Sequence, residues 1–577
     1  MKIASFLNLW LLGWAFTTCC LGGRSVEAAR PNVLFIAVDD LNDWIGCLGG
    51  HPQTLTPNID RLAASGQLFS NAHCPAPACN PSRGAILSGI SPHVSGLYDN
   101  RQKMRQMMPD AELLPKYFSR HGYWSAGSGK ILHYFTDADS WDDYFPPKET
   151  ENPFPRTFYP KNRPVSLPVG GPWQYIETDW AALDVTGEAF GGDWSVSEWI
   201  GQQLSRQHDQ AFFLACGIYR PHEPWFVPEK YFRPFLLDDI QLPPGYREDD
   251  LDDLPPSGKS RGPNRYFAHI RKHGQWKRAI QGYLASIHFA DAMVGRVLDA
   301  LANGPNRDNT IVVLWSDHGW HLGEKHHWQK YTGWRVCTLV PLIVRVPAGV
   351  SALPDGTRAG AVCSRPVNLL SLYPTLTDLA GLPAKEGNDG PSLVPLLKDP
   401  QSDWPHASLT FLNRPGNLAI SGERWRYIRY GNGDHELYDI AKDPHEWENL
   451  AERPEHNAEI RRLQQFVPET FANYRSDNTA SLPVLSWNPI GDGALPESKP
   501  GEATVDVIIA NRAGQPVDVW WIDAEGRARS FGTLEAGWQK AFGTHPGTVL
   551  HVQTIDGKTI GYFIVDDQPS LAMIPAL

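Results

Sequence analysis

Three unbroken apolar runs are the strongest pattern along the chain. They cover residues 33–38, 212–217 and 311–315. Apolar runs of this length without alternation are typical of strands buried on both faces, as in a parallel sheet. Helical patterns lie between them: Thr56-Pro57 opens one helix, and residues 279–302 space their apolar side chains for one helix face. This alternation predicts an α/β sandwich with a mostly parallel central sheet.

Acidic residues follow two of these three runs. Asp39-Asp40 comes directly after the first run, and Ser316-Asp317-His318 after the third. In open α/β sheets ligands bind at the carboxyl ends of the strands. Two adjacent carboxylates repel each other unless a cation lies between them, and hard oxygen ligands suit Ca²⁺ or Mg²⁺. We therefore expect a metal site at this edge of the sheet.

The pattern changes after residue 395, which we take as the end of a main domain that begins at residue 30. Residues 396–477 predict a smaller subdomain with a short antiparallel sheet, including a hairpin between 417 and 430 and a helix from 455 to 474. Residues 478–502 are rich in Pro, Gly and Ser, as in a linker. Short strand patterns separated by turn signals then predict a small β-sandwich over residues 503–568.

Residues 1–28 resemble a secretory signal. Lys2 precedes an apolar stretch over residues 3–16, and Val26-Glu27-Ala28 is a small-x-small cleavage site. We therefore expect a secreted or periplasmic protein. Cys19-Cys20 raises a lipoprotein alternative, but the residues before them fit a lipobox poorly. The apolar stretch is too short and interrupted for a membrane span, and no other segment predicts one.

Composition narrows the possible functions. The chain has 577 residues, too many for one core, and its net charge of −12 argues against a general nucleic-acid binder. An anionic ligand is still compatible, because a pocket can be locally basic on an acidic protein. Six cysteines follow residue 28. Their spacing fits neither a zinc site nor a dense disulfide framework, so we expect most of them to be buried apolar residues.

One of these cysteines carries the most informative motif. Cys79-Asn80-Pro81-Ser82-Arg83, followed by Leu87-Ser88-Gly89, resembles the sulfatase signature. The alternative is a structural Cys before a helix, since Pro81 and Ser82 also suit a helix start. In sulfatases this Cys is oxidised by a formylglycine-generating enzyme to formylglycine, an aldehyde that hydrates to a gem-diol. The resemblance covers roughly residues 30–455 and implies an alkaline-phosphatase-like sandwich.

Further motifs follow in the order that this family shows. Gly129-Lys130-Ile131-Leu132-His133 resembles its second signature, and it is no P-loop because Ile131 stands where Ser or Thr must bind Mg²⁺. The resemblance implies one Ca²⁺, or Mg²⁺, held by Asp39, Asp40, Cys79, Asp317 and His318. It implies catalytic roles for Cys79, Arg83, Lys130, His133, His222 and Lys330. A zinc site made by His321, His326 and His327 stays open as an alternative.

The resemblance implies hydrolysis of a sulfate ester through the gem-diol nucleophile and a sulfo-enzyme intermediate. Segments 37–43, 129–133 and 219–222 resemble the iduronate-2-sulfatase group, which suggests a sulfated sugar or polysaccharide as substrate. Aromatic residues between 137 and 195 suit either stacking on sugar rings or packing in the protein: Trp141, Tyr144, Tyr159, Trp173, Tyr175, Trp180 and Trp194. The alternatives are a phosphodiesterase or phosphonate monoester hydrolase of the same superfamily, and a catalytically silent binding protein.

The C-terminal unit resembles the β-domain of the von Hippel-Lindau tumour suppressor. The likeness rests on residues 508–512, 519–523 and 531–534. The hydroxyproline pocket of that family is not kept, because Gly543, Thr544, Thr548 and Leu550 stand at its positions. The resemblance therefore implies a fold and not a ligand. The unit would dock to a partner, a polysaccharide or the catalytic domain.

Overall fold

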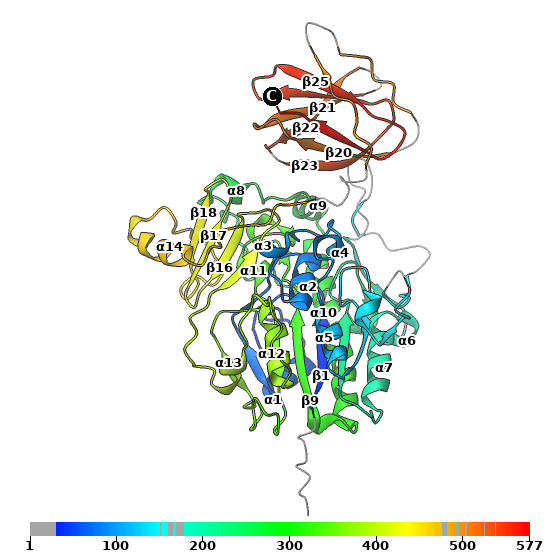
Figure 1. The fold of residues 1–577 in the computed structure, drawn as a ribbon, viewed down its shortest axis with the longest axis vertical. Helices are drawn as coiled ribbons and strands as arrows, with labels where there is room; N and C mark the ends of the chain where they lie inside the picture. The colour runs from blue at the N-terminus through cyan, green and yellow to red at the C-terminus, as the bar shows by residue number, and fades with distance from the viewer. Residues whose placement is uncertain are drawn as a thin grey trace, which may run out of the picture.

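The computed structural model describes residues 30–150, 153–159, 166–168, 178–475, 482–490, 495–501, 505–523, 526–536 and 538–576. A large sandwich of helices around a central sheet forms the body (Figure 1). A small all-β unit at the C-terminus lies beyond the end of the body toward which the arrow of β9 (Thr310–Ser316) points. The predicted signal at residues 1–28 lies outside the described residues.

The central sheet has eight strands, most of them parallel. Across the sheet they are β13 (Ala361–Cys363), β2 (Gln67–Phe69), β12 (Leu342–Arg345), β9, β1 (Asn32–Val38), β7 (Phe212–Ile218), β4 (Trp124–Gly129) and β5 (Asp143–Phe145). Only β12 runs antiparallel to its neighbours β9 and β2. The three apolar runs of the sequence form β1, β7 and β9, which are adjacent and fully buried. The predicted α/β sandwich is therefore confirmed.

Helices cover both faces of this sheet because its strands are apolar on both sides. Leu34, Ile36 and Val38 of β1 pack with α1 (Pro57–Ser65), α7 (Asp193–Leu204) and α10 (Trp276–Asn303). Val33, Phe35 and Ala37 point the other way, toward α2 (Cys79–Ser88), α5 (Leu114–Arg120) and α12 (Leu372–Leu379). Successive residues of one strand thus belong to two different cores, as the strand period of two requires.

Short elements connect these layers. The helices are α3 (Pro92–Ser95), α4 (Met104–Met107), α6 (Gly187–Phe190), α8 (Pro256–Lys259), α9 (Arg265–Lys272), α11 (Arg335–Thr338) and α13 (Val394–Lys398). The paired strands are β3 (Ala72–His73) with β14 (Val367–Asn368), β6 (Trp180–Leu183) with β8 (Trp225–Pro228), and β10 (His321–Leu322) with β11 (Trp328–Gln329). Among the described residues, no helix is both long and apolar enough to cross a membrane.

The C-terminal subdomain contains an antiparallel sheet of four strands. They are β15 (Ser408–Phe411), β16 (Leu418–Ser421), β17 (Trp425–Arg429) and β18 (His435–Asp439), and β16 and β17 form the predicted hairpin. The predicted helix over 455–474 is wrong in length, because α14 spans only Asn457–Gln464. Pro468 cannot continue a helix. The chain after it runs back over the body, where Tyr474 donates a hydrogen bond to Asp99 at 2.7 Å.

The C-terminal unit is built from two sheets that share one apolar core. The first contains β19 (Asn488–Pro489), β25 (Thr559–Ile564), β24 (Val549–Thr554), β21 (Val517–Ile522) and β22 (Ala528–Leu534); the second contains β23 (Gln539–Thr544), β20 (Val505–Asn511) and β26 (Ser570–Ile574). Val507, Val519 and Phe563 from the two sheets meet in the core. Strand pairing thus extends past residue 568 and reaches back into the predicted linker. The likeness to the von Hippel-Lindau β-domain stays a prediction.

Candidate active site

Four neighbouring parallel strands bring the candidate residues to one edge of the sheet. The order β9-β1-β7-β4 places the segments that follow these strands side by side. Val38 at the end of β1 pairs with Ser316 at the end of β9, so Asp39-Asp40 and Asp317-His318 begin at the same level. Lys130 follows β4 directly, and His222 follows β7 after a short loop.

Two glycines allow β4 and β7 to approach closely beside this edge. Gly129 has a φ of +79°, and a Cβ there would lie 2.0 Å from the carbonyl oxygen of Gly217. A Cβ on Gly217 would in turn lie 2.4 Å from the backbone of Lys130. The backbone N–H of Lys130 donates to the Gly217 carbonyl at 3.1 Å. Any larger residue at either position would therefore displace Lys130.

Helix α2 holds Cys79 at its first position. Pro81 lies in the first turn, which suits its fixed φ, and Gly89 ends the helix with a left-handed φ of +74°. Every residue of α2 is buried. The helix start that Pro81 and Ser82 indicate is therefore present. A helix start at Cys79 is compatible with a chemical role for this residue. The amino end of a helix carries partial positive charge, which favours a negatively charged atom at Cys79.

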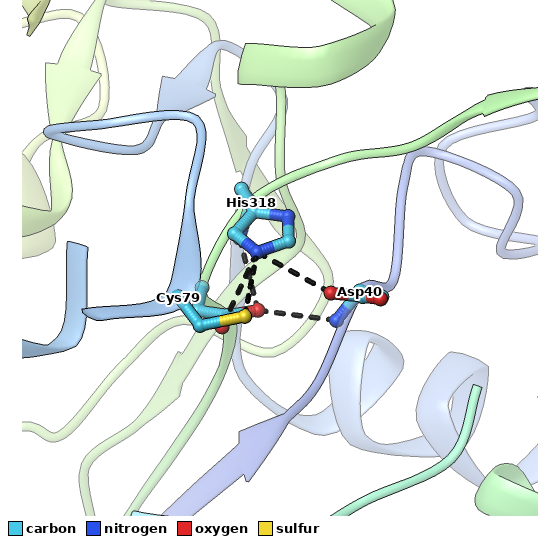
Figure 2. A group of neighbouring side chains, drawn as sticks. Asp40, Cys79 and His318 are labelled. Atoms are coloured by element: carbon cyan, nitrogen blue, oxygen red, sulfur yellow. Dashed lines mark hydrogen bonds and ion pairs between the residues drawn. The ribbon is translucent and has the colours of Figure 1, made fainter. Parts of the chain in front are cut away.

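The Cys79 side chain is surrounded by cationic groups. Its Sγ lies 3.0 Å from Nζ of Lys330, 3.3 Å from Nε2 of His318 and 3.7 Å from Nζ of Lys130. Figure 2 shows Cys79, His318 and Asp40 converging on one another. Burial would raise the pKa of the thiol, but Lys130, Lys330 and His318 outweigh it and hold this pKa well below its usual range. The position therefore stabilises an anionic atom.

Arg83, one helical turn after Cys79, connects the two acidic segments. Its Nη2 donates to Oδ1 of Asp39 at 2.9 Å, and its Nε donates to Oδ2 of Asp317 at 2.8 Å. Its Nη1 donates to the carbonyl of Lys130 at 2.5 Å. The Arg83, Asp39 and Asp317 side chains are all 0% exposed. This one guanidinium thus fixes the relative positions of β1, β9 and β4 at the site.

The acidic groups are arranged as cation ligands. Asp40, Cys79, Asp317 and His318 each offer a ligand atom within 4.8 Å of the others, and Asp39, Asp40 and His222 form a second such group. Oδ2 of Asp40 is buried and has no hydrogen-bond partner among the described residues. Lys130 bonds to Asp39, and Lys330 donates to Oδ1 of Asp40 at 2.9 Å. Buried carboxylate oxygens with one free acceptor fit a hard cation such as Ca²⁺ or Mg²⁺.

Two further predicted histidines border this centre. His222 places Nε2 3.7 Å from Oδ2 of Asp40, while its Nδ1 bonds to the carbonyl oxygen of Glu223 at 2.6 Å. Burial lowers the pKa of His133, and the nearby Cys79 side chain opposes this shift. Nδ1 of His133 is buried without a hydrogen-bond partner among the described residues. All the predicted site residues therefore lie around Cys79.

The alternative zinc site is not formed. His321 bonds to the Glu324 carbonyl and the Thr332 hydroxyl, and His326 bonds to the backbone of Arg247. The nitrogens of His327 bond to two further backbone carbonyls. The metal-competent groups of the described residues contain none of the three. These histidines instead hold the loop that carries Lys330.

One buried acid beside His222 was not anticipated from the sequence. Glu223 accepts hydrogen bonds from the Thr178 hydroxyl at 3.0 Å and from Trp328 Nε1 and Gln329 Nε2, both at 3.2 Å. Burial raises the pKa of Glu223 to about 7, although these three donors lower it in part. The carboxyl group links the His222 loop to β11, which directly precedes Lys330. In the sequence, the only sign of this role is that an acidic residue stands between His222 and Pro224.

Three of the seven aromatic residues considered for sugar stacking belong to the protein interior. Trp141, Tyr144 and Trp180 are at most 4% exposed, so stacking on a sugar is wrong for them. Trp194 packs against the Arg296 guanidinium. Tyr159, in contrast, is 44% exposed. Trp173 and Tyr175 lie outside the described residues.

Comparison with known families accounts for this arrangement. The sulfatase family model matches residues 31–382, and a model of the C-terminal part of N-sulphoglucosamine sulphohydrolase matches residues 323–472. A sulfatase from Formosa agariphila is 38% identical over 493 residues, which cover 83% of this chain and 94% of that protein. Iduronate 2-sulfatase of Mus musculus is 32% identical over 441 residues, covering 70% of this chain and 78% of that protein.

Solved structures share the fold at lower identity. A protein in complex with its substrate D-glucosamine-2-N,6-O-disulfate superposes with a TM-score of 0.59 and 21% identity, covering 76% of this chain and 96% of that one. Phosphonate monoester hydrolase of Agrobacterium radiobacter gives a TM-score of 0.58 and 22% identity, with the same coverage. From the matched family model and these relatives, the chain belongs to the sulfatase family and is a sulfuric ester hydrolase.

Proposed function

We propose that this chain removes a sulfate ester from a sulfated sugar, with residue 79 as its nucleophile. The observation that carries the proposal is the position of Cys79, at the amino end of α2 and within 3.0–3.7 Å of two lysines and a histidine. Sugar substrates are supported by the mouse iduronate 2-sulfatase and by the structural neighbour bound to a disulfated glucosamine. The iduronate-2-sulfatase-like sequence segments point in the same direction.

The nucleophile requires a change at Cys79. We propose that a formylglycine-generating enzyme converts Cys79 to formylglycine, whose hydrate supplies an oxygen nucleophile and a second hydroxyl through which sulfate can leave. Cys79 Sγ then marks the place of those oxygens. A plain Ser or Cys sulfate ester has no second hydroxyl, so it lacks this route for releasing sulfate.

We propose that a cation occupies the acidic centre of the site. Asp39, Asp40, Asp317 and His318, together with residue 79, would hold one Ca²⁺, with Mg²⁺ as the alternative. The ion would supply positive charge that lowers the cost of forming an oxyanion and polarises the sulfate group. Oδ2 of Asp40 is buried without a hydrogen-bond partner among the described residues, which supports this assignment.

The remaining roles follow from which atoms lie near Sγ. Lys330 and Lys130 are placed to bind the sulfate oxygens and to stabilise the charge that develops on them. Asp317 can accept the proton of the attacking hydroxyl while Arg83 holds its carboxylate in place. His222, on the other side of Asp40, would protonate the departing sugar oxygen. His133, near residue 79, would take the proton of the second hydroxyl and so release sulfate.

Phosphonate monoester hydrolysis is the second candidate, because a phosphonate monoester hydrolase shares the fold with a TM-score of 0.58. Comparing 4-nitrophenyl sulfate with 4-nitrophenyl phosphate and a phosphonate monoester decides between them. Our proposal predicts the highest kcat/KM for the sulfate. A higher kcat/KM for either phosphorus ester would favour the alternative.

The nucleophile is tested by substitution and mass spectrometry. Cys79→Ala should abolish sulfate release, whereas Cys47→Ala, a change at a half-buried Cys outside the site, should leave it unchanged. The active wild-type protein should yield a peptide in which residue 79 has lost its sulfur. Full activity of Cys79→Ala, or an intact thiol at residue 79 in fully active enzyme, would contradict the mechanism.

We also propose that the protein is exported, which rests on the signal-like residues 1–28.

The C-terminal unit would dock to a polysaccharide, a partner or the catalytic domain. Arg414 of the subdomain lies 5.6 Å from the ring of Trp538 in this unit, which supports contact with the body. Deleting the unit and comparing activity on small and polymeric substrates tests its role.

A further inference from the structure

A cavity of about 220 Å³ lies beside the catalytic centre, at the carboxyl ends of β4 and β7. Its lining includes Lys130 and Tyr219, which also border Cys79 and His222. Arg156, Arg220 and Asp193 are the other charged residues in its described lining. Three cationic side chains therefore face one carboxylate. This charge balance favours an anion in the cavity.

Arg220 is the unusual member of this lining. The residue is 2% exposed, yet among the described residues no carboxylate lies in ion-pair contact with its guanidinium. Its Nε and Nη2 reach the Phe226 carbonyl only at 3.4 Å, and Nη2 reaches the Tyr159 hydroxyl at 3.4 Å. These contacts are long for hydrogen bonds, so most of the donor capacity of the guanidinium is unused.

The nearby carboxylate of Asp193 does not fill this role. Its oxygens accept hydrogen bonds from the backbone N–H groups of Tyr219 at 2.7 Å and of Arg220 at 2.9 Å. Asp193 thus shapes the loop after β7 and compensates the Arg220 charge only from a distance. A buried cation without a direct counterion is costly, and a planar guanidinium fork is suited to binding an oxyanion.

The position of Tyr219 connects this cation to the reaction centre. The Tyr219 ring centroid lies 5.2 Å from the Arg220 guanidinium and 5.2 Å from Nζ of Lys130. The same ring lies 4.8 Å from the ring of His222. Arg220 and the lysine assigned to the reacting sulfate therefore flank one aromatic ring. Because each cation lies 5.2 Å from the same ring centroid, the two are at most about 10 Å apart, a distance that anionic groups on one sugar or on adjacent sugars of a chain can span.

We infer that Arg220 binds a second anionic group of the substrate while the reacting sulfate occupies the site at Cys79. The inference rests on the proposed function and deepens it, because it restricts the substrate to sugars that carry another anion near the sulfate. That anion is a carboxylate of a uronic acid or an additional sulfate. Arg220 is thus a specificity-determining residue of this cavity.

The wild-type enzyme provides the first test. Its KM is measured for a 2-O-sulfated uronic acid disaccharide, for the same disaccharide with its carboxyl reduced to an alcohol, and for a neutral sugar with one or two sulfates. At least one second anion should lower KM by about 10-fold or more, as expected for a charged hydrogen-bonded pair. A KM difference between the uronic acid disaccharide and its carboxyl-reduced form would identify the second anion as a carboxylate. A KM difference between the mono- and disulfated neutral sugars would identify it as a sulfate. Equal KM values across both pairs overturn the inference.

Substitution of Arg220 provides the second test. For Arg220→Gln, the rise in KM on the preferred dianionic substrate should exceed the rise on 4-nitrophenyl sulfate by at least 10-fold, with kcat changed much less than KM. Arg220→Lys should restore part of the affinity. Arg307→Gln, a matched change on an exposed side chain far from the site, should alter neither substrate. Equal losses on both substrates would show a merely structural role.

These outcomes separate the inference from the proposed function. If the wild-type protein releases no sulfate from any substrate, the proposed function itself is wrong. If it hydrolyses 4-nitrophenyl sulfate but shows no preference for dianionic sugars, only the role of Arg220 is wrong. If Arg220→Gln does not fold, the wild-type comparison of paired substrates still decides.

Discussion

Replacing Arg83 by Leu should destabilise the catalytic domain strongly. The substitution removes bonds of 2.8 Å to Asp317 and 2.9 Å to Asp39, and it leaves both carboxylates 0% exposed without their guanidinium. Burial alone would raise the pKa of Asp317, but the nearby charge of Arg83 holds it below its usual value. Removing one partner of a buried ion pair costs about 3–5 kcal/mol.

This free energy converts into a measurable shift of the melting temperature. The sulfatase domain matches residues 31–382. With an unfolding entropy of about 2 cal/mol/K per residue, a domain of this length loses about 4–7 °C. Differential scanning calorimetry at neutral pH measures the transition of this domain. Added Ca²⁺ should reduce the difference in melting temperature between Arg83→Leu and the wild type, because the cation can neutralise the carboxylates that have lost Arg83.

Controls separate this effect from a general loss of surface charge. Arg61→Leu removes a comparable ion pair, with Asp299 at 2.7 Å, but its side chain is 53% exposed. It should cost about 1 kcal/mol or less. Arg83→Lys should fall between Arg83→Leu and wild type. A melting temperature for Arg83→Leu within about 1 °C of wild type would refute the argument that this buried network stabilises the domain.

Three further predictions concern the site. Lys330→Met should lower kcat/KM on 4-nitrophenyl sulfate by about 10²–10³-fold, as expected for loss of a group that stabilises developing charge. Lys259→Met, a matched change at an exposed lysine, should leave kcat/KM unchanged. Equal kcat/KM values for the two variants would exclude Lys330 from the site. Chelation with EDTA should abolish activity, and added Ca²⁺ or Mg²⁺ should restore it. In Asp40→Asn, the added ion should not restore activity. Wild-type activity that survives chelation would argue against the ion. Because burial raises the pKa of Glu223 to about 7, the folded state binds a proton that the unfolded state releases near 4.5. The wild-type free energy of unfolding should therefore fall as pH rises from about 4.5 to about 7, and Glu223→Gln should remove that part of the slope in denaturant titrations.

The central sheet could be predicted because its strands are apolar on both faces. The runs at β1, β7 and β9 leave no polar position that would allow a solvated face, and the acidic residues after β1 and β9 must meet if these strands are adjacent. The antiparallel β12 was not predicted, since strand direction leaves no mark on a short apolar segment. Strand β22 was also not predicted as a strand, because most of its residues are exposed and form no apolar run.

The residues of the candidate site could be predicted from the sequence, but the residues that hold them in place could not. Motif order identified Cys79, Lys130 and Lys330, whereas the role of Glu223 depends on Trp328 and Gln329 reaching it from a distant segment. In the sequence, Arg220 belongs to a segment that resembles the family and carries no signal of its own. That no carboxylate of the described residues forms an ion pair with it is a property of the folded chain, because a guanidinium 2% exposed is indistinguishable in sequence from a solvated one.

The complete burial of α2 has a consequence for the order of events during synthesis. Cys79 is 0% exposed, and the segment before it is bonded to the subdomain: Thr410 donates to the Cys74 carbonyl at 2.6 Å, and the Phe411 N–H donates to the Pro75 carbonyl at 2.8 Å. A modifying enzyme has no access to Cys79 once these contacts exist. Residue 79 leaves the ribosome more than three hundred residues before β15. The proposed conversion of Cys79 would therefore belong to the interval in which the chain is still growing or unfolded, and folded protein that missed this interval would stay inactive.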